Sequence, residues 1–328
     1  SKSRRNRSPS PARSSSPIAG DKRARSSEDD DMRTMQAHKI NDHQGRPRAK
    51  DYDKTTQELI SIANTWFRCL LAAWDRFPDH VAEQAMLLLA WKKACEEVKV
   101  SMRVPPDFAK MITRHGPQMR GELKTKVRRL VEIIFGFDSC QNKKNIRKNR
   151  QRAEDLKEGL GYCYEVISNY VQKNPAKAEG RRGLYKAKTI QKATNLMWFS
   201  NRRDEGAMHP ELFGPIFPKP AFALVLSAIE CAIDEWATGI KTNVPFTSAE
   251  YHSVYQEQLK CFDLFEKHTE PRGILDNILT RMHSHGCFHS GAQPITPVAS
   301  ALALSRTALD AANKEYDEEE ATESDSEL

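Results

Sequence analysis

The chain has 328 residues, 29% of them charged, and a formal net charge of +7. Its longest apolar run, Ala221–Ile233, is too short to span a bilayer and is interrupted by Glu230. Its seven cysteines follow no repeated spacing, which fits reduced thiols rather than a disulfide framework. These features exclude a membrane-spanning protein and a small disulfide-stapled one.

The charge is distributed unevenly along the chain. Residues 101–192 carry 22 Lys and Arg against 9 Asp and Glu, a net charge of +13. Residues 193–328 carry 10 against 21, a net charge of −11. Such blocks are typical of proteins that bind polyanions or whose halves attract each other. Ordinary solvated helix faces give the same composition, since Lys and Arg are common surface residues.

Both ends of the chain are predicted to be disordered. Residues 1–50 are basic and rich in Ser, Pro and Arg, with too few large apolar side chains to offset the entropy of ordering. Residues 314–328 are acidic and equally poor in apolar side chains. Within the first tail, the basic clusters 2–7 and 22–25 are typical of nuclear import signals. We therefore expect a nuclear protein, with the cytoplasm as the alternative.

The first half of the folded region, 51–172, shows the helical period repeatedly. Four helices are expected, at about 59–74, 79–98, 123–134 and 156–171. The first follows a capping box at 55–58, and the third stops at Gly136. The polar residues 143–152 between the last two helices are expected to form a basic connector.

A second basic connector, 173–192, leads into the other half, 193–313. Helices are expected there at about 188–201, 220–238, 247–268, 272–283 and 296–316. The third of these opens with a capping box at 247–250, and Pro220 and Gly239 stand where a helix should start and stop. The chain is therefore predicted to be all-α, with one domain, 51–313, of about eight to ten helices.

Histidine and cysteine cluster late in this domain. His268, His285, Cys287 and His289 offer the imidazole and thiolate groups that zinc prefers. Residues 283–289 are expected to form a short loop, and they lack the paired spacing of structural zinc sites. Surface histidines are the stronger interpretation, so neither a metal nor any other cofactor is expected.

The loop 202–211 also gathers ionisable groups. Asp204, Glu205, His209 and Glu211 could act as general acids and bases. No nucleophile or phosphate-binding loop accompanies them, and a turn after a helix end explains them better. The sequence therefore predicts no catalytic residue.

Several short strings resemble one family. The most unusual is Asp234-Glu235-Trp236-Ala237-Thr238-Gly239 after an apolar helix. Further matching strings lie at 111–116, 183–185, 198–199, 203–206 and 265–269. Over about 51–313 the chain resembles an uncharacterised all-helical domain family that is expanded in mushroom-forming basidiomycete fungi. The resemblance implies a helical domain, and no activity, cofactor or catalytic residue comes with it.

We predict a non-enzymatic helical interaction module that contacts nucleic acid or another polyanion through its basic 101–192 region. The contacting residues are expected to be Arg120, Lys124, Arg128, Lys143, Lys144, Arg147, Lys148, Arg150 and Arg152. One alternative is a hydrolase-like or metal-dependent enzyme that uses the 202–211 loop or the 268–289 cluster. Another is a protein-binding structural or mobile-element-associated protein. No membrane contact is expected, and the oligomeric state stays open.

Overall fold

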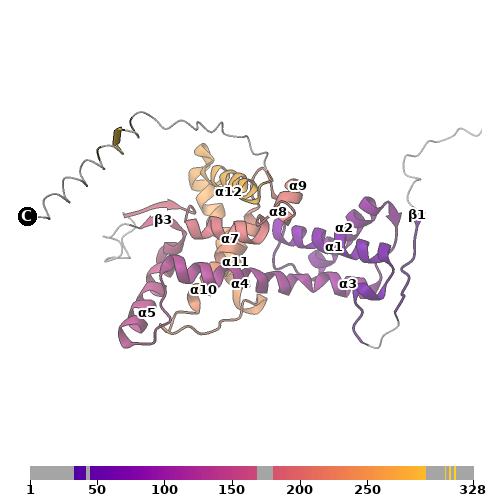
Figure 1. Ribbon diagram of the computed structural model, residues 1–328, viewed down its shortest axis with the longest axis horizontal. Coiled ribbons are helices and arrows are strands. Elements are labelled where there is room, and N and C mark those ends of the chain that lie inside the picture. The colour runs from indigo at the N-terminus through magenta and orange to yellow at the C-terminus, as the bar shows by residue number, and fades with distance from the viewer. Residues whose placement is uncertain are drawn as a thin grey trace, which may run out of the picture.

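The computed structural model describes residues 33–41, 45–167 and 180–292, together with residues 307, 310, 311 and 314. Helices dominate this part of the chain, which confirms the predicted all-α fold (Figure 1). The helices are α1 (Lys54–Ala73), α2 (His80–Val98), α3 (Pro106–Thr113), α4 (His115–Phe135), α5 (Lys143–Lys157), α7 (Lys188–Trp198), α8 (Glu205–Met208), α9 (Pro210–Phe213), α10 (Lys219–Asp234), α11 (Ser248–Thr269) and α12 (Ile274–Ser290). Short strands accompany them: β1 (Arg33–Thr34), β2 (Val100–Ser101), β3 (Tyr164–Ile167) and β4 (Arg181–Leu184).

Two buried apolar clusters form the core. The smaller cluster joins α1, α2 and α3, and the larger one joins α4, α5, α7, α10, α11 and α12. In Figure 1, α1 to α3 gather at one end, and α4 runs from them along the molecule towards α5 at the other end. The cores therefore do not follow the expected halves 51–172 and 193–313, because α4 and α5 pack with the C-terminal helices.

Helix α10 lies at the centre of the larger cluster. All residues from 221 to 229 are buried. A helix that is apolar on every side needs neighbours on every side. Helices α1, α4, α5, α7 and α11 all contact α10 and supply them.

Side-chain caps begin several of the helices. The N-cap of the predicted capping box of α11 is confirmed, since Thr247 Oγ1 accepts a hydrogen bond from the backbone N–H three residues on, at 3.4 Å. Asp79 caps α2 in the same way at 2.8 Å, as expected from the predicted start of that helix. Helix α1 begins slightly before the predicted capping box, because the Asp53 carboxylate accepts from both the N–H and the hydroxyl of Thr56. Each such cap contributes about 1 kcal/mol.

The prediction of a connector over 143–152 was wrong, because these residues open α5. The Asn142 side chain accepts a hydrogen bond from the N–H of Asn145 at 2.8 Å and so caps the helix. Buried Asn149, Ala153 and Leu156 then form an inward face. This face is short and partly polar, so the apolar period alone did not show it.

The prediction of a helix over 156–171 was also wrong. The chain leaves the α-helical conformation after Lys157, because Gly159 and Leu160 have φ angles of 53° and 56°, in the left-handed region. A 3-10 segment, η2 (Glu158–Cys163), then leads into β3, which pairs antiparallel with β4. The basic stretch before α7 therefore contains a strand.

Part of the expected N-terminal tail packs on the domain. Strand β1 pairs in parallel with β2, and the N–H of Met35 donates to the carbonyl of Ser101 at 2.9 Å. Backbone hydrogen bonds, which composition does not reveal, hold this segment. Residues 1–32, 42–44 and 315–328 of the expected tails, and most of the helix predicted over 296–316, lie outside the described residues.

A buried acidic residue follows α10 directly. Glu235 is 1% exposed, its Oε1 lies 3.0 Å from Lys124 Nζ, and its Oε2 accepts a hydrogen bond from Arg128 Nε at 2.7 Å. Asp234, the last residue of α10, accepts from Lys157 Nζ at 2.6 Å. Carboxylates at the negative end of a helix dipole are unfavourable without cations. Helices α4 and α5 supply these cations.

The turn from 235 to 239 replaces the end of the helix predicted up to residue 238. Trp236 stacks on Phe137 with ring centroids 5.0 Å apart. Gly239 has a φ of +86°, and a Cβ at this position would lie 2.2 Å from the carbonyl oxygen of Ile146 in α5. A glycine is therefore required here for both the backbone conformation and the close approach of α5.

We expect Gly239→Ala to lower the free energy of unfolding by roughly 2 kcal/mol, because the substitution adds backbone strain and a clash with α5. Gly121→Ala is the matched control, since nothing lies within 4 Å of a Cβ at this position in α4. It should raise the free energy of unfolding by about 1 kcal/mol through helix propensity. Urea denaturation measures both, and a similar loss in the two variants would contradict this explanation.

We expect Glu235→Gln to destabilise the protein by about 3 kcal/mol, because Lys124 and Arg128 lose the carboxylate that compensates them. Glu154→Gln, at an exposed position of α5, should change stability by less than about 0.5 kcal/mol. Thermal unfolding followed by circular dichroism compares the two. Equal melting temperatures would show that Glu235 does not hold these helices together.

Candidate functional site

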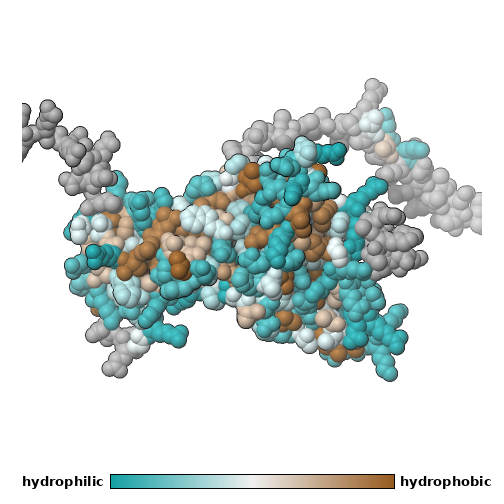
Figure 2. Space-filling view, turned by 180° about the vertical axis from the view of Figure 1, so that it is seen from behind, coloured by the Kyte–Doolittle hydropathy of each residue, from teal (hydrophilic) through white to brown (hydrophobic). Residues whose placement is uncertain are grey.

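The outer surface of α5 is the most basic surface of a single described helix. Lys143, Lys144, Arg147, Lys148 and Arg150 are all exposed. Within the described residues, none of the five forms an ion pair with a carboxylate. Hydrophilic side chains predominate at this end of the molecule in the view from behind (Figure 2). We call these five residues the α5 cationic surface.

This arrangement has an electrostatic cost. Lys143 and Arg147, like Lys144 and Lys148, are four residues apart, and like charges at this spacing destabilise a helix by about 0.2–0.5 kcal/mol per pair. The first turn of α5 also contains two lysines and no acidic residue, although a helix N-terminus favours negative charge. A phosphate-bearing ligand on this surface would relieve both effects.

The inner side of α5 is held firmly. The Asn149 side chain is 1% exposed, and its Nδ2 donates to the carbonyls of Asp138 at 2.7 Å and Gly239 at 3.0 Å. The Arg152 guanidinium donates to the carbonyl of Gly136 at the end of α4. The cationic surface therefore stands on a fixed helix, and Arg152 takes part in holding it.

The three expected contact residues on α4 are engaged inside the fold. Lys124 and Arg128 neutralise Glu235, and Lys124 Nζ also donates to Asn243 Oδ1 at 3.0 Å. The Arg120 guanidinium lies over the ring of Phe77, 5.1 Å from its centroid, and burial lowers its pKa. The structure thus divides the nine predicted residues between a solvent-facing group on α5 and a group that braces the helices. One signal was available in the sequence, since Lys124 lies three residues before Val127 and seven before Val131 of the apolar stripe.

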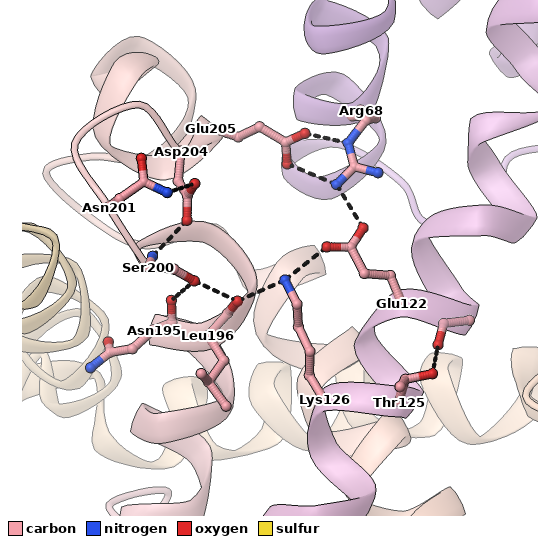
Figure 3. Close-up of polar contacts among 11 residues, drawn as sticks. Arg68, Glu122, Thr125, Lys126, Asn195, Leu196, Ser200, Asn201, Asp204 and Glu205 are labelled. Carbon is pink, nitrogen blue, oxygen red and sulfur yellow. Dashed lines mark hydrogen bonds and ion pairs between the residues drawn. The ribbon is translucent and has the colours of Figure 1, made fainter.

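The residues of the 202–211 loop are held in separate contacts. Asp204 accepts hydrogen bonds from the N–H of Ser200 and from Asn201 Nδ2, both at 2.6 Å, which closes the turn after α7 (Figure 3). His209 Nδ1 lies 3.0 Å from the Glu211 carboxylate. Within the described residues, these contacts give each group a structural partner.

Glu205 belongs to a different network, which connects α1, α4 and α8. Its carboxylate forms an ion pair with Arg68, whose Nη2 also lies 3.2 Å from Glu122 (Figure 3). Burial raises the pKa of Glu205. Burial also acts to raise the pKa of Glu122, but hydrogen bonds and charge from Lys126 and Arg68 outweigh it and lower that pKa. Arg68 thus braces the loop against the two long helices.

The histidine and cysteine cluster lies on a helix, so the prediction of a loop over 283–289 was wrong. Helix α12 continues to Ser290, and successive residues turn by about 100°. His283 and Cys287 therefore share a face, with Nε2 and Sγ 3.4 Å apart, while His285 and His289 are exposed. His268 lies on α11. In the described part of the chain, no three His, Cys, Asp or Glu side chains are grouped to hold a metal ion.

A second group of exposed cations was not singled out from the sequence. Lys186, Lys188 and Lys192 surround the start of α7, and Arg281 lies on α12, which packs against α7. The four-residue spacing of Lys188 and Lys192 was a readable signal, because it places them on one face. No signal in the sequence predicts that Arg281 lies near these lysines, because only the packing of α12 against α7 brings it there.

Comparison with known proteins gives one family. The pattern described as "Domain of unknown function (DUF6532)" matches residues 62–265, which include α5 and most of the core. No curated protein and no solved structure matches the chain. Among the described helices, none is long and apolar enough to cross a membrane.

Proposed function

We propose that this chain, which belongs to the DUF6532 family of domains of unknown function, is a helical module that binds the phosphate backbone of nucleic acid through the α5 cationic surface. The observation that supports the proposal is a fixed helix with five exposed cations that lack carboxylate partners among the described residues. The fold could have neutralised them, as it neutralises Lys124, Arg128 and Lys157. Their repulsion is instead left for a ligand to relieve.

Binding of this kind depends on salt in a calculable way. Each phosphate neutralised on duplex DNA contributes about −0.9 to the slope of log K against log salt concentration. Five contacts would give a slope of about −4.5. Phosphate contacts carry no sequence information by themselves, so affinity should vary little between duplexes of equal length.

The composition of the N-terminal tail supports a nuclear location for this protein. Its clusters 2–7 and 22–25 have the composition of nuclear import signals, and they lie outside the described residues. A tail of this charge would add further phosphate contacts to those of the α5 cationic surface.

We expect Lys144→Gln combined with Lys148→Gln to weaken binding to a fluorescent DNA duplex and to reduce the magnitude of the salt slope by about 2. The two side chains are exposed, so folding should not change. Fluorescence polarisation across a salt series measures the effect, and heparin as competitor tests whether any polyanion suffices.

The matched control is Lys54→Gln combined with Lys110→Gln. These lysines are exposed on α1 and α3, at the other end of the molecule, and removing them changes the net charge equally. The control should keep the wild-type slope. A slope reduced equally in both double variants would refute the assignment to α5, and absence of binding at low salt would refute the function.

The main alternative is a protein-binding role, which a pull-down with and without nuclease can distinguish from nucleic acid binding. Partners recovered in a pull-down should disappear after nuclease treatment if nucleic acid bridges them. Partners that survive nuclease treatment but are lost from the Lys144→Gln and Lys148→Gln double variant would instead assign α5 to protein binding.

A further inference from the structure

A pocket of about 390 Å³ lies between α7 and α12, apart from α5. Its base is apolar, and its rim is cationic. The base is formed by Tyr185, Ala187, Ile190, Ile278 and Met282, and the rim by Lys186, Lys188, Lys192 and Arg281, with Gln191, His285 and Glu165 beside them. We propose that this pocket binds a nucleoside phosphate, with its base on the apolar surface and its phosphates among the rim cations.

The rim favours an anion. Four exposed cations face one carboxylate, that of Glu165, and within the described residues no ion pair neutralises the four. Helix α7 begins at this rim without a side-chain cap and without an acidic residue in its first turn. The positive end of its dipole therefore adds to the charge of Lys188 and Lys192.

The base of the pocket favours a flat apolar group on the same ligand. The five residues that form it are each at most 6% exposed, and the Tyr185 ring packs edge-to-face on Phe222, Phe262 and Phe265. This surface is thus rigid. A bare inorganic anion would bind at the rim and leave the apolar surface in water, whereas an aromatic base would cover it.

The size and the polar groups of the pocket agree with this ligand. Its volume falls within the range of about 300–1,000 Å³ that is typical of small-molecule sites. Gln191 Nε2 donates to the carbonyl of Met282 at 3.1 Å and so joins α7 to α12 across the pocket. The side-chain oxygen of Gln191 and the ring of exposed His285 remain to bond the polar edge of a base.

We test the proposal with the full chain and N-methylanthraniloyl-ADP, whose fluorescence reports binding. Saturable binding is expected, with ADP competing at least tenfold better than either adenosine or pyrophosphate, because neither fragment covers both parts of the pocket. Equal competition by pyrophosphate would overturn the role of the apolar surface. Equal competition by adenosine would overturn the role of the cations.

Variants assign the site. Lys188→Gln, Lys192→Gln and Arg281→Gln should each weaken binding roughly tenfold, as expected for the loss of a charged hydrogen bond. All three residues are exposed, so the variants should fold. Lys110→Gln, on α3, and Lys54→Gln, on α1, should leave the affinity unchanged. An equal loss in these controls, or no saturable binding by the wild type, would refute the pocket.

The result is independent of the α5 proposal. Duplex binding that depends on Lys144 and Lys148 can fail while the pocket binds the nucleotide, and the reverse also holds. If a 5′-phosphorylated oligonucleotide displaces the probe better than ADP does, the natural ligand is the end of a nucleic acid strand. If ADP displaces the probe better, the ligand is a free nucleotide.

Discussion

The arrangement of the helices depends on the acidic end of α10. Glu235 is buried where the helix dipole already favours positive charge, so it can be accommodated only if cations reach it. Lys124 and Arg128 come from α4 to do so, and Lys157 reaches the adjacent Asp234 from α5. Helices α4 and α5 are thereby held against the central helix. The glycine that follows lets α5 approach closely enough to complete the contact.

The same interaction determines which basic residues remain available to a ligand. Some cations of the basic block 101–192 pair with carboxylates of the acidic block 193–328 within the fold. The cations that face α10 form such ion pairs and are not available to a ligand. Those on the far side of α5, and those around the start of α7, form no ion pair with a carboxylate among the described residues. Net charge along the sequence therefore overstates the exposed cationic surface, because ion pairs inside the fold remove part of it.

The helical class, the start of α2 at Asp79 and the cap at Thr247 could be predicted, because local periodicity and capping chemistry determine them. Helix α5 could not, since its inward face relies on Asn149, a polar residue whose partners come from two distant turns. The pocket was equally hidden, because only the packing of α12 on α7 brings Arg281 and His285 to it, and His285 lies beyond the predicted end of the helix at His283. These features depend on contacts between distant segments of the chain, and such contacts cannot be predicted from a single sequence.

Helix α1 contributes to both apolar clusters. Leu59, Ile60 and Phe67 lie in the smaller cluster, while Cys69 and Ala72 lie in the larger one. If either cluster loses its packing, α1 is therefore displaced and the other cluster loses contacts as well. The two should behave as one cooperative unit in native-state hydrogen exchange, with the slowest amides of α1 and α10 opening together. We therefore expect the two cores to unfold in a single transition.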